Sequence, residues 1–160
     1  MEQIPAVETV ESVAILVAEE IRKLKSFVEN SAKQDKYRED YPGEGHLPAP
    51  WLTMDQELLI KTLETGKLEV ARELAVILSV KSNNGSDKDE AFKVTHICGA
   101  VSYLVIAREQ EYLLSLSRSW EKLASNADSK AEASYQAETN QKWYQEAIMN
   151  AKEMLSMNPS

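Results

Sequence analysis

Two histidines are the residues of this chain with the most evident capacity for metal or proton chemistry. A carboxylate-bridged metal site in a helical protein joins glutamates from facing helices through Glu-x-x-His pairs. His46 lacks this spacing, because Gly43 stands three residues before it. His96 lacks it too, since Lys93 occupies the corresponding position. We therefore expect no metal and no cofactor.

Three further catalytic patterns each lack a required member. Histidine phosphotransfer domains carry His-x-x-Lys-Gly, whereas His96 is followed by Ile-Cys-Gly. Nucleotide pyrophosphatases of the MazG type need Glu-x-x-Glu on one helix and Glu-x-x-Asp on another; Glu8 and Glu11 supply the first spacing, but the second does not occur. The single cysteine, Cys98, cannot form an internal disulfide and is predicted to be a buried free thiol. These absences favour a protein that is not an enzyme.

Composition points to one acidic globular domain. The chain has 160 residues, of which 43% are hydrophobic, so residues 1–160 can bury a core without metals or disulfides. The net charge of -8 disfavours nucleic acid and anionic membranes as partners. The first residues have neither the basic start nor the apolar core of a signal peptide, so we expect a cytoplasmic protein.

The hydrophobic centre of the chain is the run 94–107, which contains no Asp, Glu, Lys or Arg. A helix that crosses a bilayer needs about 20 apolar residues, so this run indicates a buried helix instead. Asp87 with Glu90 is typical of a helix start, and Asn126 of a helix end. The sequence therefore predicts one helix over 87–125, longer than any other.

Three more helices are predicted from apolar residues at helical spacing, over 6–33, 53–81 and 129–156. Gly66 interrupts the second of these. Either the helix continues through Gly66, or the glycine ends one short helix before another begins; we favour the unbroken helix because its length matches the first. The fold class is then all-α, an up-down four-helix bundle with an overlong central helix.

The connection 34–52 holds three prolines and two glycines, which block helix. Disordered linkers are poor in aromatic residues, so the rings here indicate a structured loop between the first two helices. This loop either caps the bundle or binds a ligand or partner. Its candidate binding residues are Tyr37, Tyr41, His46 and Trp51.

The distal half of the central helix predicts self-association. The helix overhangs its neighbours by roughly 12 residues, or about 18 Å at the rise of an α-helix. Large apolar side chains on this overhang would face only the alanine-rich start of the last helix. A two-fold partner with the same stripe would cover them. The predicted dimer interface is Leu113, Leu116, Trp120 and Leu123, centred on Leu116 and Trp120.

The leading functional hypothesis is a non-catalytic protein-protein interaction module: an adaptor, assembly factor or inhibitor that binds another protein through helix faces and the 35–52 loop. One alternative is a small-ligand binder or enzyme with a pocket under that loop. A second alternative is an acidic mimic of nucleic acid, although the acids alternate with bases and form no long rows.

Overall fold

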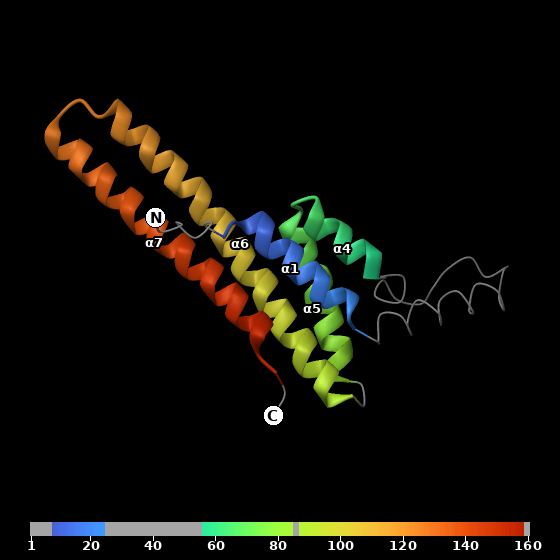
Figure 1. Ribbon diagram of the computed structural model, residues 1–160. Coiled ribbons are helices and arrows are strands. Elements are labelled where there is room, and N and C mark those ends of the chain that lie inside the picture. The colour runs from blue at the N-terminus through green and yellow to red at the C-terminus, as the bar shows by residue number, and fades with distance from the viewer. Residues whose placement is uncertain (1–7, 25–55, 85–86, 159–160) are drawn as a thin grey trace, which may run out of the picture.

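The computed structural model describes residues 8–24, 56–84 and 87–158 (Figure 1). Of these, 88% are helical and none lies in a strand, which confirms the all-α class. The described residues form five helices: α1 (Val10–Arg22), α4 (Gln56–Glu64), α5 (Leu68–Asn83), α6 (Lys88–Leu123) and α7 (Ala127–Ser156).

Helix α1 covers part of the predicted helix over 6–33, of which residues 6–7 and 25–33 lie outside the described residues. It begins at Val10 because Thr9 is its N-cap: the Thr9 hydroxyl accepts from the Ser12 N–H at 3.1 Å, and the Thr9 N–H donates to the Ser12 hydroxyl at 2.9 Å. It ends at Arg22, and Lys23 is its C-cap. One face is fully buried, with Val10, Val13, Ala14, Val17, Ala18 and Ile21.

The predicted unbroken helix over 53–81 is wrong, because Gly66 ends α4. Gly66 adopts φ 76°, a left-handed conformation that L side chains rarely take. Its N–H donates to the Leu63 carbonyl at 3.3 Å, and the Lys67 N–H donates to the Thr62 carbonyl at 2.9 Å. These two bonds are the Schellman motif, which satisfies the last carbonyls of a helix. α5 then starts at Leu68 in a new direction.

Helix α6 occupies the region of the predicted central helix. The Asp87 side chain caps it by accepting from the Glu90 N–H at 3.0 Å. Within the described residues, α6 is long and apolar enough to cross a membrane by length and composition. The core helix of a soluble protein meets the same criteria, so this finding does not by itself indicate a membrane. Its first half lies in the hydrophobic core, where Val94, Ile97, Val101 and Leu104 are buried.

Helix α7 returns along α6, and the two form the most extensive helix pair of the described residues (Figure 1). It begins at Ala127, two residues before the predicted start, because Asn126 is the N-cap and accepts from the Ser129 N–H at 2.8 Å. Its buried positions are mostly alanine, as at Ala133, Ala137 and Ala147. Small side chains let the two helices approach closely along their length.

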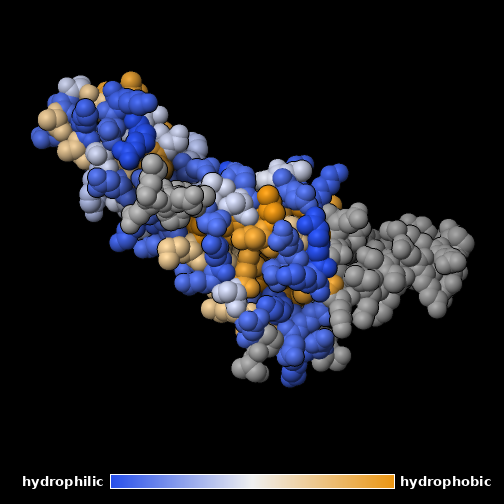
Figure 2. Space-filling view, in the orientation of Figure 1, coloured by the Kyte–Doolittle hydropathy of each residue, from blue (hydrophilic) through white to orange (hydrophobic). Residues whose placement is uncertain are grey.

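The α6–α7 hairpin extends well beyond α1, α4 and α5 in Figure 1. We call residues 108–143 the arm, which comprises the distal half of α6, the turn and the first half of α7. The remaining described residues form the body. In Figure 2, apolar side chains gather over the body, whereas this face of the arm is mainly hydrophilic. The molecule therefore has one packed core and one projecting hairpin.

Candidate interaction surface

The predicted loop site lies outside the described residues. It comprises Tyr37, Tyr41, His46 and Trp51. The structure places the other predicted site, the apolar stripe of the overhang, on the distal half of α6. The candidate surface is therefore built from the arm.

The four residues of the predicted dimer interface become progressively more exposed toward the tip of the arm. Leu113 and Leu116 are half-buried, whereas Trp120 is 55% exposed and Leu123 is 81% exposed. Steps of three and four residues keep such side chains on one side of a helix. The stripe is thus partly covered by α7 near the body and open to solvent at the tip.

Sequence reasoning missed the exposed aromatic residues on α7. Tyr135 is 67% exposed and Trp143 is 50% exposed, and on α6 Tyr112 is 67% exposed. With Trp120, these are all the aromatic side chains among the exposed large hydrophobics of the described residues. The sequence did contain a signal for this exposure. Tyr135 and Trp143 lie off the alanine seam of α7, so their rings do not face α6.

A cavity of about 380 Å³ opens between the two helices near the tip. Trp120 and Leu123 line it from α6, Ala124 lines it from the C-cap of α6, and Ser129, Glu132, Ala133 and Gln136 line it from α7. The two alanines present only methyl groups to it. No larger side chain of the described residues fills the space, so the exposed Trp120 ring lies beside an open hollow with a mixed apolar and polar lining.

Below this cavity the arm is held together by a buried polar layer. The Ser117 hydroxyl donates to Asn140 Oδ1 at 3.0 Å, and Asn140 Nδ2 donates to Gln110 Oε1 at 3.0 Å. Ser117 is 4% exposed and Asn140 is 6% exposed. Buried polar groups are costly without partners, so this arrangement favours the one pairing of α6 with α7 that satisfies both side chains.

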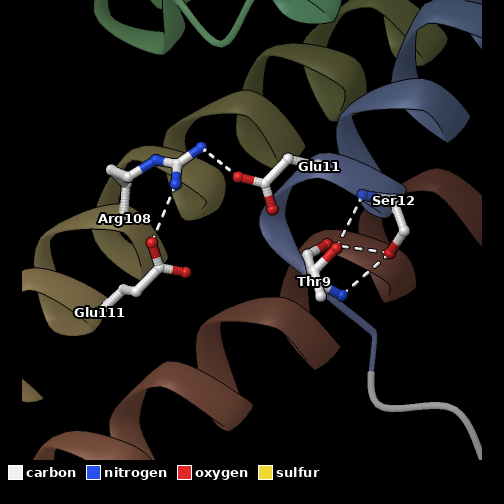
Figure 3. A network of polar contacts seen from close by, with 5 residues as sticks. All are labelled: Thr9, Glu11, Ser12, Arg108 and Glu111. Carbon is white, nitrogen blue, oxygen red and sulfur yellow. Dashed lines mark hydrogen bonds and ion pairs between the residues drawn. The ribbon is translucent and has the colours of Figure 1, made fainter.

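An ion-pair network marks the junction of arm and body (Figure 3). The Arg108 guanidinium donates to Glu11 of α1 at 2.8 Å and to Glu111 at 2.9 Å. The backbone N–H of Glu11 and the Arg108 guanidinium hold the pKa of the Glu11 carboxyl below its usual range. Because these side chains are largely exposed, the network positions α1 against α6 more than it stabilises the fold.

The groups in the described residues that could support catalysis are not assembled into a site. The ring of His96 stacks on Phe92 with centroids 4.1 Å apart, and its Nδ1 lies 2.8 Å from the Phe92 carbonyl oxygen. Burial raises the pKa of the half-buried Cys98 thiol, which disfavours the reactive thiolate. Among the described residues, no group of three or more His, Cys, Asp or Glu could hold a metal ion.

No known protein family matches this chain, and no curated protein sequence or solved structure is similar to it. Function is therefore argued from the surface itself.

Proposed function

We propose that this protein is a non-catalytic interaction module that binds another protein through the faces of its helices, and that its first partner is a second copy of itself. The observation that carries the proposal is the cluster of exposed aromatic and leucine side chains on the arm. Trp120 is 55% exposed and Leu123 is 81% exposed, on a hairpin that extends beyond the body (Figure 1).

Exposure of such large groups favours a partner on energetic grounds. Burial of one large apolar side chain contributes roughly 1.5 to 3 kcal/mol, and tryptophan and tyrosine are enriched among residues that dominate binding energy. Within the arm, Arg108 pairs with Glu111 and Arg118 pairs with Glu121, while Ser117, Asn140 and Gln110 form the buried polar layer. An adaptor, assembly factor or inhibitor would use this surface in the same way.

The up-down four-helix bundle predicted from the sequence stays a prediction for the complete chain. The antiparallel packing of α7 on α6 supports it, because the two helices run back along each other through a short turn (Figure 1). The division of the predicted second helix into α4 and α5 adds a helix to that arrangement.

Light scattering on the eluted protein tests self-association. The chain has a mass of 18.0 kDa, and we expect twice that mass at micromolar concentration. A mass of 18.0 kDa at every concentration would overturn the proposal.

A pair of variants then locates the interface. Leu116→Glu places a charge in the apolar stripe, and we expect it to dissociate the dimer while helicity by circular dichroism is retained. Ser115→Glu is the matched control, because Ser115 is exposed and lies about 100° around the helix from Leu116. Dissociation by both variants, or by neither, would move the interface away from this stripe.

A further inference from the structure

The cavity at the tip of the arm has the size and lining of a receptor for one aromatic side chain. Its volume is about 380 Å³, and Trp120, Ala124 and Ala133 are among the residues that line it. A tryptophan ring that packs into this open hollow loses water from the face that contacts it, and tryptophan is enriched among residues that dominate an interface. The chain itself offers this ring, since Trp120 is 55% exposed beside the cavity.

Charge on the arm favours a second copy as the occupant. The arm, residues 108–143, carries five basic and six acidic side chains, so its net charge is -1, whereas the chain carries -8. The described residues of the body, 8–24, 56–84, 87–107 and 144–158, carry 13 acidic and 9 basic side chains, a net charge of -4. Two arms can meet with little repulsion, while two bodies repel each other.

The same charge distribution selects an orientation. If two arms paired in parallel, the acidic bodies of both copies would lie side by side at one end. Antiparallel pairing places them at opposite ends, separated by the length of the paired arms. It also brings the Trp120 of each copy close to the cavity of the other, since both lie near the tip.

We infer that two arms pair antiparallel about a two-fold axis near Trp120, and that each Trp120 side chain enters the cavity of the partner. Leu116 and Leu123 then flank the axis, and the two hairpins form a four-helix contact. This inference rests on the proposed self-association and adds its geometry and the residue that each copy contributes to the other.

Cross-linking tests the orientation in a Cys98→Ala background, which removes the single native thiol. Cysteines are introduced at Tyr112 or at Leu123, which lie on either side of the proposed axis. We expect a short bis-maleimide to link the Tyr112→Cys protein to the Leu123→Cys protein in a mixture. The Tyr112→Cys protein alone should not cross-link, because its two introduced cysteines lie about 24 Å apart along antiparallel arms whose axis is near Trp120, at the helical rise.

The outcomes separate this inference from the proposed function. Cross-linking of the Tyr112→Cys protein to itself would overturn the antiparallel orientation. A dimer by light scattering without any cross-link would place the interface outside the arm and also overturn the inference. A monomer by light scattering would overturn self-association itself.

Affinity measurements test the receptor role of the cavity. We expect Trp120→Ala to raise the dimer Kd by at least about tenfold, since it removes the inserted ring. Tyr135→Ala is the matched control, because Tyr135 is 67% exposed on the arm but does not line the cavity. We expect its Kd to stay within about threefold of the parent. Equal effects of the two substitutions, or no effect of Trp120→Ala, would overturn the insertion.

Discussion

The two halves of α6 belong to one continuous helix but are stabilised by different physics. In the body half, a series of apolar side chains is buried: Ala91, Val94, Ile97, Ala100, Val101, Leu104 and Ala107. In the arm half, the buried residue of α6 is Ser117. The first half is therefore specified by apolar area removed from water, and the second by hydrogen bonds and the close approach of α7.

This difference separates the half of α6 that contributes most to stability from the half that specifies how α6 and α7 pair. Apolar burial is non-directional and scales with area, so the body half is stable but tolerates several packings. A buried polar layer contributes little net stability yet penalises every arrangement that leaves its members unpaired. The arm is consequently well defined in register but has a surface of exposed aromatic and leucine side chains still to bury.

The largest contrast should come from leucine truncations in the two halves. Leu104 is fully buried, so Leu104→Ala should lower the free energy of unfolding by about 2 to 5 kcal/mol. Leu116 is half-buried, so Leu116→Ala should lower it by only about 1 kcal/mol. Urea denaturation at low protein concentration, where self-association contributes least, measures both. Equal losses would mean that the two halves share one core.

The next largest effect should come from the polar layer. Asn140→Ala removes the partner of the buried Ser117 hydroxyl and of Gln110, and should destabilise the arm by about 1 to 3 kcal/mol. Hydrogen exchange should show faster exchange in residues 108–143 with little change near Leu104. Thr139→Ala is the control, since its hydroxyl bonds only the Tyr135 carbonyl. Its effect should stay within about 0.5 kcal/mol.

The turn between α4 and α5 should be the most sensitive connection of the body. Gly66→Ala forces a Cβ into φ 76°, which costs about 1 to 2 kcal/mol even though no atom lies within 4 Å of that Cβ. The loss should appear in the thermal unfolding of the whole protein and leave the dimer Kd of the arm unchanged. A Gly66→Ala protein as stable as the parent would contradict the Schellman turn.

The smallest effect should come from the junction. Glu11→Gln removes the ion pair with Arg108, and because the Glu11 side chain is 61% exposed and that of Arg108 is 38% exposed, it should cost less than about 1 kcal/mol. The Glu11 carboxyl has a lowered pKa in the folded protein, so its contribution is complete above its usual value of about 4.3 and is lost as the pH falls through the folded value. The stability difference between parent and variant should therefore shrink below about pH 4.

Helix content and the position of the central helix could be predicted because their signals are local. The capping pair Asp87 and Glu90 indicates the start of α6, and an apolar side chain every three or four residues indicates its buried face. The prediction of one unbroken second helix was wrong because it relied on the similar length of the first helix and not on the tendency of Gly66 to end a helix. Its left-handed conformation is a property that the sequence does permit one to expect.

The candidate site was less predictable because it consists of large side chains that no neighbouring helix buries. Trp120 and Leu123 could be identified as an apolar stripe beyond the neighbouring helices. The exposure of Tyr135 and Trp143 depends on the rotation of α7 about its axis, which the alanine seam fixes only after α6 and α7 are docked. The cavity is lined by residues of both helices and by the C-cap Ala124 between them, so no periodicity in one helix predicts it.

The pairing of Asn140 with Ser117 and Gln110 fixes the position and rotation of the tip of the arm relative to the body. A slip of one residue between α6 and α7 would turn these side chains by about 100° and break both hydrogen bonds, so the tip is held at a fixed distance and azimuth from the body. Lengthening both helices by seven residues between this layer and the body would move Trp120 outward by about 10.5 Å and keep it on nearly the same side. Lengthening both helices by five residues would instead rotate the Trp120 side of the tip by about 140° relative to the body.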